Sequence, residues 1–265
     1  MSKVPRMVAV LTAALLALAM AVPAFAQSGD AQVRVAHLAS DAPNVDVYVN
    51  GEPVEALQNV SYGTVSQYLA LPAGTQQVTV YAAGDTSTPV IDTPVNLASG
   101  AAYTIGAVGL VSDGSLTAQV YEDDLSAPAE GTGKVRAVHA SPDAGPVDVV
   151  PAGGDPLVTG LEFPNASPYA EVPAGSYTLN INAAGTDQTA ISADATIESG
   201  TTYSAFAVGT AAAGNLDVIL TMDSVGGMAQ MPDTGGISPV VIFGTGMLAL
   251  AISVTGLYTL RRRSA

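Results

Sequence analysis

Apolar and polar residues alternate with a period of two along most of the chain. Val33, Val35 and His37 lie on one face of such a segment, and the same alternation returns at 45–49 and 77–81. This period is typical of half-buried β strands. Segments rich in Gly, Pro, Asn and Asp separate the strands and are typical of turns. The pattern predicts an all-β protein built from antiparallel β-sandwiches, Ig-like or transthyretin-like, of about seven or eight strands each.

The alternating region is an internal duplication. The segment VRVAHLASDAPNVDVYV at 33–49 returns at 135–150 as VRAVHASPDAGPVDVV. The two histidines, His37 and His139, are separated by 139 − 37 = 102 residues, and later matches keep almost the same offset. We therefore expect two tandem sandwich domains. Their predicted ranges are 32–123 and 134–223, joined by a polar, turn-rich linker at 124–133.

The repeated residues also carry a family resemblance. The segment VRVAHLASDAPNVDVYVNG, together with LPAG at 71–74 and SGAAYTIGAVG at 99–109, resembles a family of bacterial and archaeal secreted domains of unknown function. Domains of this family often stand in tandem on surface proteins. The resemblance implies a β-sandwich fold and an exported setting, and it offers no catalytic residues to carry over.

The N-terminus has the composition of an export signal. Two basic residues precede the apolar run 7–22, and the small residues Ala24 and Ala26 form an A-x-A cleavage site. Residues 1–26 are therefore predicted to be a signal peptide, with Gln27 as the new N-terminus. A retained membrane helix is the alternative, but the run is short for a span.

The C-terminus has three parts in the order of a cell-wall sorting signal. A hinge at 224–239 contains Met231, Pro232, Asp233, Thr234 and Gly235, and it precedes the apolar run 240–260 and the basic tail 261–265. The run of about 21 residues is about 31 Å long as a helix, which is enough to cross a membrane. The arginines after it favour an inside tail and outside domains.

The motif at 231–235 resembles the L-P-x-T-G signal read by sortases, with Met231 in place of leucine. The resemblance implies cleavage after Thr234 and a sortase-like transpeptidase as partner. The alternative is that the motif is only a hinge before an ordinary membrane span. Either reading places the protein on the extracellular face of the cell envelope, anchored by a single span or attached to the wall.

Several polar residues recur in both copies and are the candidate site residues. They are Arg34, His37, Asp41 and Asp46 in the first copy, and Arg136, His139, Asp143 and Asp148 in the second. We interpret them as structural: histidines that satisfy the turn after their strand, Asx-turn aspartates beside proline, and Arg–Asp pairs across adjacent strands, Arg34 with Asp46 and Arg136 with Asp148.

A hydrolytic triad is the alternative interpretation of these positions. His37, Ser40 and Asp41 include its residue types, but they are too close in sequence to be presented from separate elements. The serine also moves by one place, to Ser141, in the second copy.

The amino-acid composition excludes several kinds of functional site and disfavours one class of ligand. The absence of cysteine excludes disulfides, thiolate nucleophiles and Cys-ligated metals. Calcium at the acidic segment 122–124 is one alternative, and a solvated linker is the other. Between residues 27 and 230 the formal charge is 3 − 22 = −19, which disfavours binding to nucleic acid.

The sequence therefore predicts a surface-anchored, non-enzymatic binding or structural module without a cofactor. Its expected partner is an unknown envelope protein or glycan. A hydrolase acting on envelope polymers is the alternative function.

Overall fold

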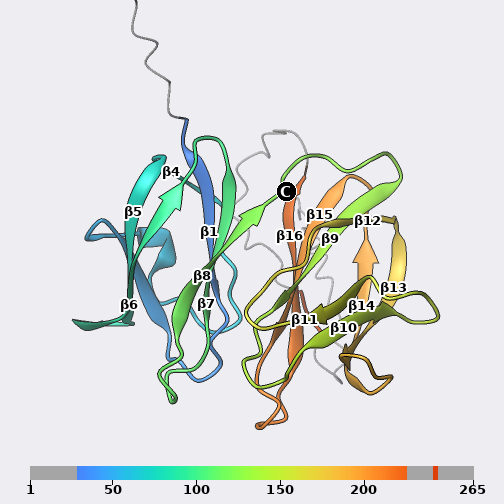
Figure 1. Cartoon of the computed structure of the whole chain (residues 1–265). Coiled ribbons are helices and arrows are strands. Elements are labelled where there is room, and N and C mark those ends of the chain that lie inside the picture. Colours follow the sequence, from blue (N-terminus) through green and yellow to red (C-terminus); the bar gives the residue numbers. More distant parts are fainter. Residues whose placement is uncertain (1–28, 226–240, 244–265) are drawn as a thin grey trace, which may run out of the picture.

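The computed structural model describes residues 29–225 and 241–243, and within them the chain is all-β (Figure 1). Each half of the chain forms a pair of facing sheets, so the prediction of two tandem all-β domains is confirmed. The signal peptide at 1–26, the motif at 231–235 and the basic tail lie outside the described residues.

The first half contains eight strands and one short 3-10 helix. These elements are β1 (Ala31–His37), β2 (Val45–Val49), β3 (Glu52–Pro53), η1 (Glu55–Leu57), β4 (Leu69–Leu71), β5 (Gly74–Ala82), β6 (Asp85–Leu97), β7 (Ala102–Val108) and β8 (Thr117–Asp123). One sheet has the order β4-β1-β7-β8 and the other β3-β2-β5-β6.

The second half repeats this arrangement. Its strands are β9 (Thr132–His139), β10 (Val147–Pro151), β11 (Val158–Leu161), β12 (Ala170–Pro173), β13 (Gly175–Ala183), β14 (Thr189–Ile197), β15 (Thr201–Val208), β16 (Asp217–Val225) and β17 (Val241–Phe243). The sheets have the orders β12-β9-β15-β16-β17 and β11-β10-β13-β14.

Strand β17 falls within the run 240–260 that we expected to be a transmembrane helix. Its three residues pair antiparallel with β16, and the rest of the run lies outside the described residues. In the part of the chain that the structure describes, no helix is long and apolar enough to cross a membrane.

The prediction of purely antiparallel sheets is wrong at one pairing in each half. Strand β1 runs parallel to β7, with Gln32 opposite Ala102 and His37 opposite Ala107. Strand β9 runs parallel to β15 in the same way. The reason is the connection: the chain crosses to the second sheet between these strands, and parallel neighbours need such a crossover. Local alternation carries no information about that path.

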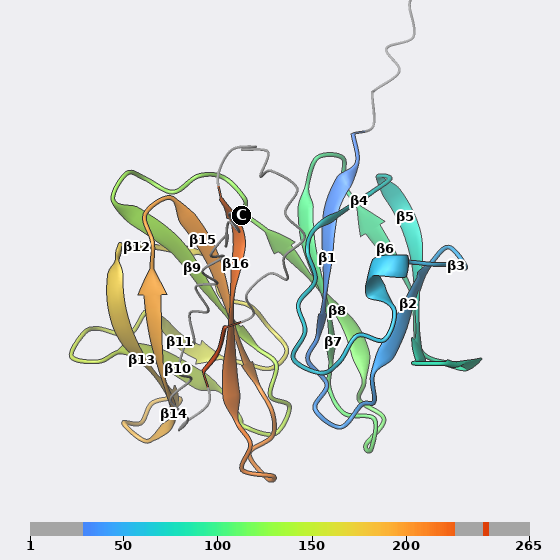
Figure 2. The ribbon, with the colours of Figure 1, turned by 180° about the vertical axis from the view of Figure 1, so that it is seen from behind.

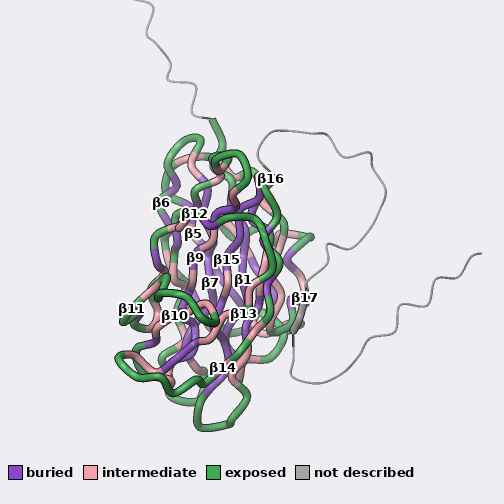
Figure 3. Tube along the Cα trace, turned by 90° about the vertical axis from the view of Figure 1, so that its right-hand side faces the viewer, coloured by how far each residue is buried: buried purple, intermediate pink, exposed green. Residues whose placement is uncertain are grey.

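The two halves pack face to face, which gives four sheet layers (Figures 1 and 2). The sheet containing β1 faces the sheet containing β9 across an apolar cluster contributed by both halves. Leu38, Val108 and Tyr121 come from the first half, and Val138 and Phe206 from the second. Figure 3 shows buried chain concentrated along the central strands. The outward face that alternation assigns to solvent is therefore the interface between the repeats.

Candidate functional site

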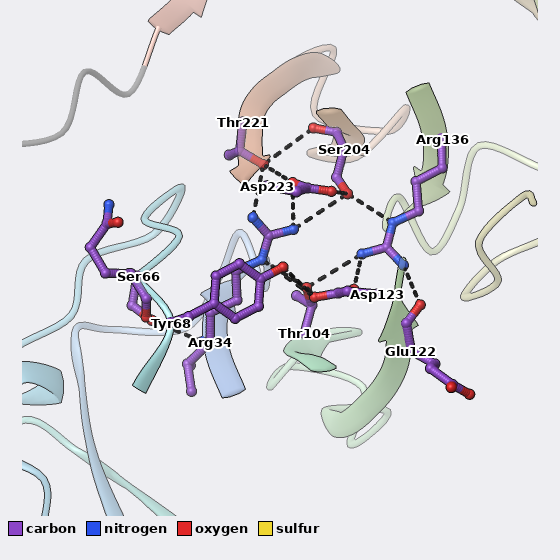
Figure 4. A network of polar contacts seen from close by, with 12 residues as sticks. Arg34, Ser66, Tyr68, Thr104, Glu122, Asp123, Arg136, Ser204, Thr221 and Asp223 are labelled. Atoms are coloured by element: carbon purple, nitrogen blue, oxygen red, sulfur yellow. Dashed lines mark hydrogen bonds and ion pairs between the residues drawn. The ribbon is translucent and has the colours of Figure 1, made fainter. Parts of the chain in front are cut away.

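A charged cluster lies buried between the two halves (Figure 4). Arg34 on β1 and Arg136 on β9 are each only 2% exposed. The Nη2 atom of Arg34 lies 2.7 Å from Oδ1 of Asp223, in the second repeat. Arg136 makes the reciprocal ion pair with Asp123, in the first repeat. Each repeat therefore supplies one cation and one anion to its partner.

Hydroxyl groups complete this reciprocal arrangement. The Nε atom of Arg34 donates to Thr104 Oγ1 at 2.8 Å, and that of Arg136 donates to Ser204 Oγ at 2.8 Å. The Nη2 atom of each arginine donates to the hydroxyl of the other repeat at 3.3 Å: Arg34 to Ser204, and Arg136 to Thr104. The contacts are related by an approximate two-fold relationship between the repeats, as expected when two similar sheets meet through the same face.

A tyrosine from each repeat closes the cluster. The Tyr68 hydroxyl donates to Asp123 Oδ2 at 2.6 Å, and the Tyr169 hydroxyl donates to Asp223 Oδ2 at 2.8 Å. The rings also lie over the guanidinium groups: the distance from Cζ to ring centroid is 4.9 Å for Arg34 with Tyr68 and 4.8 Å for Arg136 with Tyr169. Burial raises the pKa of both tyrosines, so they stay neutral donors.

The cluster is electrically balanced. Burial alone would lower the pKa of Arg34, but the neighbouring carboxylates of Asp223 and Asp123 outweigh this effect and raise that pKa above its usual value. Two buried cations face two buried anions, each with additional hydrogen-bond partners. These are the conditions under which a buried ion pair is tolerated. With its charges paired and buried, the cluster can hold the two halves together.

The expected pairing of Arg34 with Asp46 and of Arg136 with Asp148 is wrong. Strands β1 and β2 belong to different sheets, as do β9 and β10, so these residues are not cross-strand neighbours. Asp46 instead accepts hydrogen bonds from the backbone N–H groups of Asn59 at 2.6 Å and Gly84 at 2.9 Å.

Asp148 accepts equivalent bonds from Gly160 at 2.7 Å and Gly185 at 2.9 Å. These two bonds lower the pKa of Asp148, because they favour the charged carboxylate. Both aspartates therefore hold together two loops that are distant in sequence.

The expected Asx turns at Asp41 and Asp143 are also wrong. The two oxygens of Asp41 accept from the backbone N–H groups of Val111 and Ser112, at 2.8 and 2.9 Å. The oxygens of Asp143 accept the equivalent bonds from the backbone N–H groups of Ala211 at 2.7 Å and Ala212 at 2.9 Å. These carboxylates bind the turn between β7 and β8 and the turn between β15 and β16, each about 70 residues away in sequence.

Each histidine bonds the turn that follows its strand. Nε2 of His37 lies 2.9 Å from the carbonyl oxygen of Pro43, and Nε2 of His139 lies 2.7 Å from that of Gly145. Both side chains are buried at 1% exposure. Within the described ranges no hydrogen bond joins His37 to Ser40 or Asp41, so the three residue types of a triad are not assembled.

Two carboxylates of the acidic segment 122–124 make separate ion pairs within the protein. Asp123 belongs to the buried cluster, whereas Asp124 pairs with Lys134 Nζ at 2.6 Å. Lys134 and Ser126 lower the pKa of Asp124 to about 2. Among the residues that the structure describes, no group of three or more His, Cys, Asp or Glu side chains is arranged to hold a metal ion.

Sequence reasoning missed the two aspartates that neutralise the arginines. Asp123 and Asp223 are equivalent in the two repeats and are separated by 223 − 123 = 100 residues; Asp123 is the last residue of β8, and Asp223 lies near the end of β16. A useful signal was available: two of the three cations between 27 and 230 recur at one repeat position. Such scarce charges call for a recurring anion, and Asp123 with Asp223 is one such pair.

Solved structures give only distant likenesses. The TIE protein of Bacillus anthracis is 12% identical with a TM-score of 0.23, over 69% of this chain and 34% of that one. This chain thus spans about a third of that protein. A family 41 carbohydrate-binding module from streptococcal virulence factors is 13% identical with a TM-score of 0.22, over 66% of this chain and 92% of that one.

A family 26 carbohydrate-binding module from Eubacterium rectale Amy13K, solved with maltoheptaose, is 12% identical with a TM-score of 0.21. The match covers 76% of this chain and 98% of that one. Likenesses of this size carry no argument about function.

Sequence comparison is more decisive. No protein of curated function matches the chain. The family model described as Domain of unknown function (DUF4397) matches twice, at residues 31–150 and 133–231. These ranges together cover both repeats and most of the chain, so the protein belongs to the DUF4397 family.

Proposed function

We propose that the protein is a non-enzymatic binding module on the outer face of the cell envelope, in which two DUF4397 repeats act as one rigid body. The observation that carries this proposal is the reciprocal cluster of Arg34, Asp123, Arg136 and Asp223 between the repeats.

Rigidity follows from what separation of the repeats would expose. The interface holds four buried charges and the apolar cluster that contains Phe206 and Val138. A hinge motion at this interface would expose the apolar cluster to water, which is unfavourable, and would break both ion pairs at once. The repeats are therefore held as a single unit.

The placement of the polar residues supports binding rather than catalysis. Four aspartates accept hydrogen bonds from backbone N–H groups through both of their carboxylate oxygens: Asp41, Asp46, Asp143 and Asp148. These bonds fix the loops at the ends of the sandwiches. Fixed loops on a rigid scaffold are suited to present a surface to a partner.

The charge of the surface narrows the class of partner. The Lys and Arg side chains of residues 29–225 are Arg34, Lys134 and Arg136, and all three are buried. The exposed charges of this region are therefore carboxylates. Such a surface attracts cationic partners and repels nucleic acid and other polyanions.

Anchoring is part of the proposal and concerns residues outside the described ranges. The motif at 231–235 and the apolar run after it would hold the module at the envelope, through a membrane span or through a sortase-like transpeptidase. From Asp223 to Met231 there are 231 − 223 = 8 residues, which reach at most about 29 Å. While the span is in the membrane, the repeats would thus stay close to its surface.

The test uses the purified region 27–230 and isolated cell envelopes that retain both their polymers and their proteins. We expect saturable co-sedimentation with the envelopes, without release of soluble fragments. Heat-unfolded protein is the control for non-specific sedimentation. Soluble fragments that increase with time would favour the hydrolase, and failure to co-sediment would refute the binding role.

A further inference from the structure

The two repeats differ in how the open side of each sandwich is covered. In the first repeat, the hairpin of β2 and β3 leads into η1, a short helical turn beside β2 in Figure 2. This turn buries Leu57 to 3% exposure, and Val54 packs on the same core. The cavity that remains beneath them is only about 20 Å³.

Among the described residues, nothing covers the second repeat in the same way. Where the first repeat has η1, the segment 152–157 forms no helix, and Leu157 is 38% exposed. An apolar groove of about 350 Å³ opens there. Its floor consists of Val135, Val172, Leu179 and Ile197, and Pro151, Leu157 and Tyr177 are among its walls. Three floor residues, Val135, Val172 and Leu179, match Val33, Leu71 and Val78 in the first repeat, so the same core position is closed in one copy and open in the other.

One substitution between the repeats changes the lining of this groove. In the first repeat Gln76 is buried and donates to the carbonyl oxygen of Pro72 at 2.8 Å. Its equivalent Tyr177 donates to the carbonyl oxygen of Pro173 at 2.7 Å, and its ring lines the groove. A tyrosine ring with a fixed hydroxyl is a rigid apolar wall, which suits a binding surface.

A single unpaired carboxylate stands at the groove. Asp155 is exposed and lines the opening, and it makes no hydrogen bond or ion pair with another described residue. No exposed lysine or arginine of residues 29–225 can neutralise it, because the three cations there are buried. An apolar floor beside an unpaired anion matches a ligand that is apolar at one point and cationic at the next.

We propose that this groove binds a peptide segment of a partner protein, in which an aliphatic or aromatic side chain lies next to a lysine or arginine. The apolar side chain enters between Leu157 and Tyr177, and the cationic group pairs with Asp155. This inference rests on the proposed binding function and names its site. The acidic surface around the groove draws the cationic segment toward it.

The experiment measures binding of short peptides to the region 27–230 by fluorescence anisotropy. The probe is a labelled peptide with the core Lys-Leu-Phe-Lys. Two comparison peptides replace the lysines by glutamates or the apolar pair by serines. We expect only the probe to bind, and its affinity to fall with added salt because an exposed charge pair is screened.

Variants of the protein locate the site. Asp155→Asn removes the charge at constant shape and should weaken the probe about two- to fivefold. Leu157→Asn removes apolar surface at similar volume and should weaken it about threefold or more. Asp187→Asn is the matched control, because Asp187 is an exposed carboxylate at the other end of the β13–β14 hairpin and should have no effect. All three positions are exposed, and melting curves check that each variant folds.

The outcomes separate this inference from the proposed function. Equal affinity for the probe in all variants, or equal loss in Asp187→Asn, would overturn the groove as its site. If the protein sediments with the isolated envelopes but binds no probe, the binding role stands and the groove inference fails. If it binds neither, both proposals fail.

Discussion

Replacing Arg34 by methionine tests whether the buried cluster holds the two repeats together. The substitution keeps an unbranched side chain but removes the charge that faces Asp223 at 2.7 Å. Asp223 would then remain buried in the interface with no cation at that distance. We expect a large loss of stability, because an uncompensated buried charge is far more costly than a lost surface contact.

The magnitude follows from the surroundings of Asp223. Breaking a buried pair by removing one partner costs about 3 to 5 kcal/mol. Asp223 keeps hydrogen bonds from Tyr169 at 2.8 Å and Ser204 at 2.5 Å, so its oxygens are not left without a donor. These remaining donors place the expected loss near the lower end, at about 3 kcal/mol.

Denaturation of the region 27–230 by guanidinium chloride at pH 7 measures this loss as a shift of the unfolding midpoint. The control is Asp187→Asn, which removes an exposed carboxylate from the turn between β13 and β14. We expect the control to cost less than about 0.5 kcal/mol. A loss in Arg34→Met no greater than in the control would refute the reasoning. Combining Arg34→Met with Asp223→Asn should cost less than the sum of the single changes, because the pair is removed as a unit.

Three further predictions test other parts of the structure. Burial lowers the pKa of His37 and His139 below 6.5, more than their turn hydrogen bonds raise it, so the unfolded chain binds more protons than the folded one. The stabilisation that these two histidines contribute is fully present above pH 6.5 and is lost as the pH falls below that value. Replacing both by glutamine should therefore make the denaturation midpoint depend less on pH between pH 7 and 5. The fragments 27–127 and 130–228 should each form homodimers and not monomers in analytical ultracentrifugation, because each exposes an Arg–Asp face that complements itself. Thr234→Ala should abolish detergent-resistant attachment if a transpeptidase uses the motif, and identical extraction of mutant and parent would leave it as a hinge.

The alternation of residues predicted the strands but not what covers them. The alternation predicts that Arg34 and Ala36 face solvent, because it describes the two faces of one sheet and not what packs against them. In the structure the same face of the second repeat covers them, and both are buried. The scarcity of cations, with two of three at one repeat position, was the available clue to a buried role.

The pairing of distant strands could not be read from local pattern. The contact of Arg34 with Thr104 spans 70 residues, and it depends on β1 lying beside β7. The loops held by Asp41 depend on the same topology, which is why a local Asx turn was expected there. The groove of the second repeat could not be predicted from the sequence either, because it is open only where no described residue covers Val135 and Leu179.

The duplication explains how a buried ion cluster and an open groove can occur in one molecule. Two similar faces meet in a self-complementary way only if each presents both an arginine and an aspartate, as Arg34 with Asp123 and Arg136 with Asp223 do. This requirement constrains the shared face in both copies alike. The opposite sheets carry no such constraint, because they do not face the other repeat. One copy can therefore keep its core closed by Leu57 while the other opens it beside Leu157, and a new binding surface can arise in the second copy without loosening the interface that holds both.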